Sequence, residues 1–301
     1  MGVTVPLAHL VAGSLAPLQL APAALLTVLY ALRVRTLARS GRAPGGARQG
    51  AFYAGMGLIV VTLASPLGHL SDELLLAHMA EHLLIADLGA LLLVLGLTAP
   101  ILAPALRIGF LDRLRVLVHP AVALPLWAVD FYGWHLPVLY QAAVRDSGVH
   151  ALEHFMFIVL GVNMWMALLG PLPKPAWFGN LARLAYIIAV RLIGGVLANV
   201  FLWSGAAFYR AYARGEVYWH IAPGADQSTA GAIMMVEGSI LTVCLFAWLF
   251  LRSAREGEER QELLDFASQR GLELSDARAA RAVAAGRGAD LRRRLQARAG
   301  G

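Results

Sequence analysis

The sequence is poor in cysteine, which limits the kinds of metal site and covalent link that it can form. Cys244 is the single cysteine among the 301 residues. A disulfide within the chain is therefore excluded, and so are metal clamps made of two closely spaced thiolates. Any metal site must use histidine, methionine or carboxylate side chains.

Charged residues are also scarce. They make up 15% of the sequence, whereas hydrophobic residues make up 58% and the mean hydropathy is +0.63. Soluble globular domains carry about 25% charged residues, so this class is excluded. Apolar runs recur along the chain, and each is long enough to cross about 30 Å of hydrocarbon at about 1.5 Å per residue. The sequence therefore predicts an all-α fold, a polytopic helical bundle in the lipid bilayer.

Seven apolar segments are predicted to be transmembrane helices. They comprise residues 14–34, 51–68, 74–98, 119–136, 149–171, 184–206 and 228–251. Twelve basic residues follow the first, third, fifth and seventh segments, whereas the opposite side has three, Arg145, Arg210 and Arg214. Because cytoplasmic loops are enriched in Lys and Arg, the N-terminus is predicted outside and the C-terminus in the cytoplasm. The same asymmetry accounts for the net charge of +6 without a nucleic-acid partner.

Two stretches outside these segments differ from them in composition. Residues 99–118 contain too much proline and charge to cross the membrane, and we expect a short amphipathic helix along the inner interface. Beyond residue 251 the chain is charged and rich in alanine, with interruptions at Gly271 and Gly286. We therefore predict a seven-helix transmembrane domain, residues 1–251, and a charged cytoplasmic tail, residues 252–301, with one or two short helices.

The pattern His-x-x-Glu-His occurs twice, as HMAEH at 78–82 and HALEH at 150–154. Inverzincin proteases use this spacing to bind zinc. On a helix the three polar side chains share one stripe, and the two imidazoles lie about 6 Å apart along the axis. A polar stripe that faces lipid is costly, so we expect both stripes to face the bundle interior and to supply four nitrogen ligands there.

Two more histidines extend the predicted site. His69 and His135 lie at the outer ends of the second and fourth segments, and each precedes one of the motifs, which hints at an internal repeat. Six of the nine histidines thus fall in the outer third of the membrane. The predicted metal ligands are His69, His78, His82, His135, His150 and His154. The remaining histidines, His9, His119 and His220, are interpreted as structural or loop residues.

The residue types favour copper. Imidazole binds copper, zinc and iron alike, whereas thioether favours Cu(I). Methionines accompany the motifs and the last apolar segment, at positions 79, 156, 234 and 235. Copper as Cu(I) is therefore the favoured metal. Three alternatives stay open: a zinc hydrolase in which Glu81 or Glu153 activates a metal-bound water, a haem protein with paired histidine ligands, and a purely structural role for the histidines.

Four charged residues lie within the apolar segments, where an isolated charge costs about 2.5–3.5 kcal/mol on insertion scales. They are Asp87, Asp130, Arg191 and Glu237. The expected depths of Arg191 and Asp87 in the membrane differ by about 5 Å. An arginine side chain can cover this difference, so we predict an ion pair between them. Asp130 and Glu237 are closer to the histidines, and we expect them to orient imidazoles or to find other hydrogen-bond partners.

Three stretches of the sequence resemble one family. They are residues 119–171, HMAEHLLIADLGALLLVLGLTAP at 78–100 and DQSTAGAIMMVEG at 226–238. Their combined motifs are Trp-His-x-Pro, His-x-x-Glu-His followed by Trp, and Asp-Gln-x-x-Ala-Gly. Over about residues 50–250 the chain thus resembles the CtaG-like cytochrome c oxidase assembly factors. These are seven-helix bacterial membrane proteins linked to caa3-type haem-copper oxidases.

The resemblance implies a multi-pass protein of the bacterial cell membrane that serves the respiratory chain. Its role would be to help mature the oxidase, without catalysis, by holding or delivering copper to an oxidase subunit as client. The family motifs fall on His78, His82, His135, His150 and His154, with Asp226 and Gln227 opening the last helix. At Glu81 the family pattern often has Gln, which argues against Glu81 as an obligatory catalyst.

Overall fold

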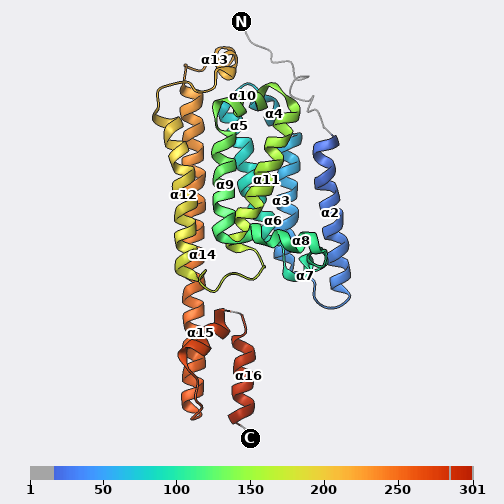
Figure 1. Ribbon diagram of the computed structural model, residues 1–301, viewed down its shortest axis with the longest axis vertical. Helices are drawn as coiled ribbons and strands as arrows, with labels where there is room; N and C mark the ends of the chain where they lie inside the picture. Colours follow the sequence, from blue (N-terminus) through green and yellow to red (C-terminus); the bar gives the residue numbers. More distant parts are fainter. Residues whose placement is uncertain (1–16, 285, 300–301) are drawn as a thin grey trace. The chain divides into compact units, whose positions relative to one another are not determined.

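The computed structural model describes residues 17–284 and 286–299, and in these ranges the secondary structure is helical, without strands (Figure 1). The prediction of an all-α fold is confirmed for this part of the chain. Contacts group the described residues into two units, the first up to Ser239 and the second from Ile240.

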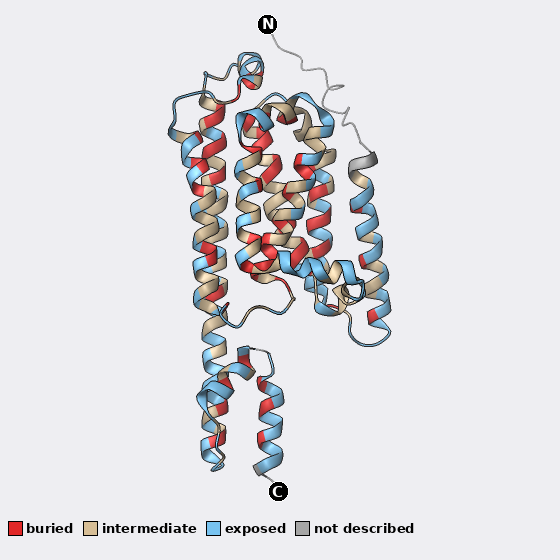
Figure 2. Cartoon of the chain, in the orientation of Figure 1, coloured by how far each residue is buried: buried red, intermediate tan, exposed pale blue. Residues whose placement is uncertain are grey.

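The first unit holds most of the apolar helices. Its longer elements are α2 (Pro17–Ala38), α3 (Gly46–Ala64), α5 (Leu75–His82), α6 (Ala90–Gly96), α9 (Pro120–Trp134), α10 (Pro137–Arg145), α11 (Ser147–Leu169) and α12 (Asn180–Trp203). Short helices α4 (Leu67–Ser71) and α13 (Ala213–Tyr218) lie in the connections, and α14 begins at Ala225. Buried positions recur along α5, α9 and α11 (Figure 2).

Five described helices are long and apolar enough to cross a membrane. They are Leu20–Ala38, Leu75–Gly96, Ser147–Leu169, Asn180–Trp203 and Ala225–Gln269. A sixth is counted if Gly109–Val118 and Pro120–Trp134, which meet at 79°, form one span. The one expected segment without a counterpart among these, residues 51–68, corresponds to α3, whose first turns contain Arg48 and Gln49 and are therefore less apolar. The count of seven and the orientation of the termini stay predictions.

The span Leu75–Gly96 is interrupted in its middle by a π-helix, η1 (Leu83–Gly89), between α5 and α6. Neighbouring helices approach this segment through glycine. A Cβ on Gly161 of α11 would lie 2.2 Å from the carbonyl oxygen of Ala86, and one on Gly55 of α3 would lie 2.8 Å from that of Gly89. Small residues permit such close packing of apolar helices. The π-helix therefore lies directly against the backbones of α3 and α11.

Residues 99–118 are helical as expected, but a single amphipathic helix is wrong. The stretch is divided into α7 (Ala99–Leu102), a 3-10 turn (Ala105–Arg107), α8 (Gly109–Arg113) and a second 3-10 turn (Leu114–Val118). Pro104 separates the first two segments, and proline cannot donate the backbone hydrogen bond that would continue α7. The first break therefore follows from a proline of the stretch that argued against a span.

The second unit contains the end of α14 and two short helices. α14 (Ala225–Gln269) continues well past residue 251, where the last apolar segment was predicted to end. Charged residues prolong it, because Arg252 and Glu256 pair one turn apart at 2.7 Å and support a solvated helix. α15 (Asp276–Ala284) and α16 (Gly288–Ala299) follow, as expected for the tail, and Gly271 takes the left-handed conformation after α14. The domain boundary at 251/252 stays a prediction.

Candidate metal centre

The two His-x-x-Glu-His motifs meet in the first unit. α5 carries the first motif and the beginning of α11 carries the second. The structure forms two groups in which one ligand atom from each residue lies within 4.8 Å of those of the others. They are the inner group, His78, His82, His150 and Glu153, and the outer group, Glu81, His150 and His154. The predicted convergence of the two stripes is thus found, and His150 belongs to both groups.

Each glutamate lies against the histidines of the other motif. Glu153 Oε2 is 3.7 Å from His78 Nε2 and 3.9 Å from His82 Nε2. Glu81 Oε2 is likewise 3.9 Å from His154 Nε2. These separations are too long for hydrogen bonds. They are near the spacing of two ligands on one tetrahedral ion, about 3.4 Å for metal–ligand bonds of about 2.1 Å. The motif carboxylates, which were not among the predicted ligands, therefore fit a ligand role.

Many polar atoms of this cluster are buried without a hydrogen-bond partner. This holds for both ring nitrogens of His82 and of His154 and for both carboxylate oxygens of Glu153. Glu153 is 0% exposed and His154 is 6% exposed. A buried polar atom without a partner costs about 1–3 kcal/mol, and a bound cation would satisfy several at once. The donor set of imidazoles and carboxylates therefore fits a transition-metal ion.

The other two predicted ligands lie outside both groups. His135 follows α9, where its Nδ1 donates to the Phe131 carbonyl oxygen at 2.6 Å, and its buried Nε2 has no hydrogen-bond partner. Its ring centroid is 5.9 Å from that of Phe157. His69 lies instead within the short helix α4. The two hairpins thus have similar order along the chain but place these histidines differently, one after a long helix and one within a short helix.

Three of the four methionines that favoured Cu(I) have other neighbours. Met79 and Met234 pack in a hydrophobic cluster with Leu75 and Tyr140. The sulfur of Met235 accepts hydrogen bonds from Arg191 and Asn199, each at 3.5 Å. The candidate metal ligands of the cluster are therefore imidazole and carboxylate groups.

Three tyrosines that sequence reasoning did not single out border the cluster. Tyr140 is fully buried, its ring centroid is 4.8 Å from that of His78, and its hydroxyl shares a 2.8 Å hydrogen bond with Tyr212. Tyr209 donates to the carbonyl oxygen of His135 at 2.7 Å. Burial raises the pKa of the Tyr209 and Tyr212 hydroxyls, so both stay protonated. No local sequence pattern marks these residues, because their partners come from distant segments.

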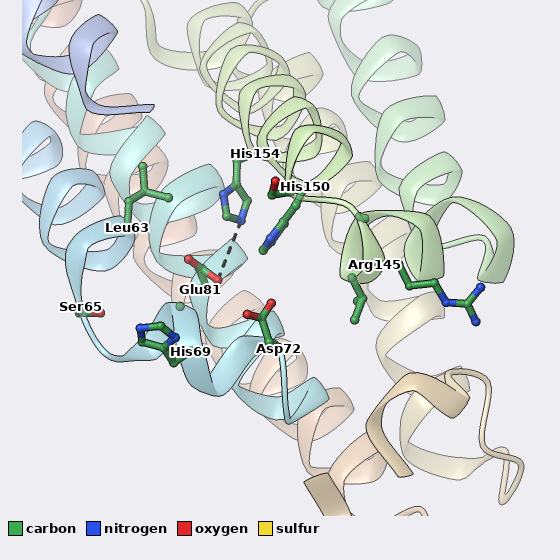
Figure 3. A pocket seen from close by; sticks show the side chains of 12 residues that line it. Leu63, Ser65, His69, Asp72, Glu81, Arg145, His150 and His154 are labelled. Atoms are coloured by element: carbon green, nitrogen blue, oxygen red, sulfur yellow. Dashed lines mark ion pairs between the residues drawn. The ribbon is translucent and has the colours of Figure 1, made fainter. Parts of the chain in front are cut away.

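A pocket of about 310 Å³ opens beside one side of the cluster (Figure 3). Its polar lining includes His69, Asp72, Glu81, Arg145, His150 and His154. Figure 3 shows the Glu81 carboxylate directed to the His154 ring, with Asp72 and His69 beside it. The pocket therefore reaches the outer group of ligands.

Each motif helix begins at an aspartate carboxylate. Asp146 precedes α11 and accepts from the backbone N–H groups of Gly148 and Val149. α5 has no such cap of its own; Asp226 of α14 instead accepts from the N–H groups of Leu75 and Leu76, at 2.6 and 2.9 Å. A carboxylate at a helix N-terminus satisfies free donors and complements the helix dipole. Asp226 therefore fixes the start of the helix that carries the first motif.

Replacement of Asp226 by Asn is expected to lower the free energy of unfolding by about 1.5–3 kcal/mol, the range for hydrogen bonds to a charged group. The measurement is thermal unfolding in detergent. Thr229→Ala is the matched control, because the Thr229 hydroxyl donates to Ala225 within its own helix and the residue is exposed. Equal stability of the Asp226 variant and the wild type would show that α5 does not depend on this cap.

The predicted ion pair between Arg191 and Asp87 is wrong. Within the described part of the chain Arg191 donates instead to Ser239 Oγ at 2.9 Å and to the Met235 carbonyl oxygen at 3.3 Å. Asp87 lies beside the carboxyl group of Glu237. Asp87 belongs to the π-helix, whose wider turn changes the face on which a residue lies relative to α-helical spacing.

Asp130, His119 and His220 lie outside the two ligand groups. Asp130 is buried beside the Trp134 indole. His119 precedes α9, where its Nδ1 accepts from the Ala121 N–H at 3.3 Å. His220 is an exposed loop residue in the left-handed conformation, with φ of 55°. His9 lies outside the described residues.

Comparison with known proteins identifies the family. No curated protein and no solved structure matches the chain. The family described as cytochrome c oxidase caa3 assembly factor (Caa3_CtaG) matches residues 28–256, well over half of the 301 residues. This match includes both motif helices, the capping residue Asp226 and every predicted ligand. The chain therefore belongs to the caa3 assembly factor family of cytochrome c oxidase.

Proposed function

We propose that this protein is a non-enzymatic assembly factor that binds copper in its histidine and glutamate cluster and passes it to an oxidase subunit. The observation that carries the proposal is the set of buried, unpartnered imidazole and carboxylate atoms on α5 and α11. The family membership indicates that the client protein is an oxidase under assembly. We place the protein in the bacterial cell membrane as a multi-pass component, because its helices are apolar and its client belongs to the respiratory chain.

Copper follows from the donors and from the client. The resemblance connects the family with haem-copper oxidases, and imidazole sites hold copper more tightly than other divalent metals of its row. The oxidation state depends on the softness of the ligands. Because Met79 and Met235 are engaged elsewhere and carboxylates complete the donor set, Cu(II) fits the cluster better than the Cu(I) expected from the methionines.

A zinc hydrolase is the second candidate, favoured by the pocket that reaches Glu81. Such an enzyme needs three protein ligands, an open coordination position and a carboxylate that activates water. A Glu81→Gln variant would then keep its metal and lose turnover, whereas an assembly factor has no turnover to lose. A haem centre is disfavoured, because the His78 and His150 rings stack 5.2 Å apart at 14°, whereas axial histidines direct nitrogen atoms to the iron from opposite faces.

The proposed function is tested by deletion of the gene in its native host and measurement of the copper content and activity of the purified caa3-type oxidase. We expect both to fall, and to be restored by the wild-type gene. A variant in which the four motif histidines are alanine is expected not to restore them. His220→Asn is the control, because it removes an exposed imidazole outside the cluster and asparagine tolerates positive φ. Full restoration by the four-histidine variant would contradict the proposal.

A further inference from the structure

The two ligand groups of the cluster differ in their access to the pocket. All three members of the outer group, Glu81, His150 and His154, line the pocket. The remaining members of the inner group, His78, His82 and Glu153, are absent from the pocket lining. His150 is shared by both groups and is the most exposed ligand of the inner one.

On the basis of the proposed function, we propose that the cluster is a two-station transfer path for one metal ion. The outer station, formed by Glu81, His150 and His154, receives the ion from the pocket. The inner station, formed by His78, His82, His150 and Glu153, holds it. His150 remains bound while the ion moves between the stations.

The transfer is an exchange of ligands. The bonds from the ion to Glu81 and His154 break, bonds to His78, His82 and Glu153 form, and the oxidation state does not change. The geometry permits this over a short distance, because the ring centroids of His78 and His150 are 5.2 Å apart and those of His82 and His154 are 5.3 Å apart. The ion therefore always has ligands within reach, which avoids the large cost of a bare charge in an apolar interior.

The residues at the pocket entrance suit a cation. Asp72 is exposed, lies in the turn between α4 and α5 and lines the pocket. His69 lines the same pocket and offers an imidazole on the way to Glu81. Arg145 is the positive group in the lining, on the side of α10. Asp72 and His69 thus provide an approach to the outer station alongside Glu81 (Figure 3).

Because both stations share His150, we expect one copper ion per chain. The order of the stations predicts that changes at the outer station alter the rates of copper loading and release, whereas changes at the inner station weaken copper binding. The experiment uses the full chain in detergent, loaded with Cu(II), and follows the release of copper to an external chelator after rapid mixing. Glu81→Gln, which keeps side-chain size, is expected to slow loading and release about tenfold while the bound copper stays near one ion per chain. His154→Asn is a second outer-station variant with the same expectation.

An inner-station change has the opposite expectation. His78→Asn should weaken copper binding about tenfold or more and speed up release, because the ion loses a ligand of its resting site. His220→Asn should leave both rates unchanged. Wild-type rates in both outer-station variants, or two copper ions bound to one wild-type chain, would overturn the two-station path.

The outcomes separate this inference from the proposed function. If the outer-station variants show wild-type rates while deletion of the gene still removes copper from the oxidase, the path is wrong and the proposed function stands. If the rates change as expected while the oxidase matures without the protein, the path stands and the role in assembly is wrong. A wild-type chain that binds no copper overturns both.

Discussion

Protein in which His78, His82, His150 and His154 are all replaced by alanine is expected to purify without copper, whereas the wild type carries about one ion per chain. The four changes remove every imidazole from both ligand groups and leave only the carboxylates of Glu81 and Glu153. Carboxylates alone suit calcium, magnesium and manganese rather than copper. Elemental analysis of detergent-purified protein measures the difference, with a fall to about a tenth of the wild-type content or less as the expected result.

The control for this variant must separate loss of ligands from loss of the fold. Four alanines leave cavities, but they also remove buried ring nitrogens that have no hydrogen-bond partner without metal. The helical content by circular dichroism and the elution volume should therefore stay close to those of the wild type. The double variant His78→Asn and His150→Asn, which fills more of the space, should lose copper as well. Retention of stoichiometric copper by both folded variants would exclude the cluster as the binding site.

The convergence of the two motifs was predictable because it depends on local geometry. Residues three and four positions apart share a helical stripe in any α-helix, so His78, Glu81 and His82 had to face one direction. The cost of polar groups in lipid then required both stripes to face protein. The reciprocal contacts, in which Glu153 lies against His78 and His82, were not predictable, because they depend on the relative height and rotation of α5 and α11.

The errors of the sequence reasoning arise where tertiary structure changes local geometry. The ion pair between Arg191 and Asp87 assumed regular α-helix, whereas η1 places Asp87 on a π-turn beside Glu237. The caps of the two motif helices were not predicted: Asp146 directly precedes α11, whereas Asp226 caps a helix about 150 residues away in sequence, which no local pattern marks. By contrast, the prediction of a short amphipathic helix at 99–118 was wrong for a local reason, because Pro104 should have divided it.

Gly161 couples the packing of the bundle to the ligand cluster, and its replacement by alanine is expected to damage both. The added Cβ would lie 2.2 Å from the backbone carbonyl oxygen of Ala86 in η1. A backbone atom cannot rotate away, so α11 must move from the π-helix. Overpacking of this kind costs about 1–3 kcal/mol or more, and we expect the upper end of that range. Because His154 lies two turns before Gly161 on the same helix, the shift also separates the histidines of α11 from those of α5.

The measurement is the thermal midpoint and the copper content of Gly161→Ala in detergent, with both expected below the wild-type values. Gly57→Ala is the matched control, since Gly57 is also within a helix but a Cβ there meets nothing within 4 Å. Alanine favours a helix over glycine by about 1 kcal/mol, so the control should be at least as stable as the wild type. A Gly161 variant that unfolds and binds copper like the control would show that α11 and η1 can separate without cost to the cluster. The dependence of the ligand geometry on this contact would then be wrong.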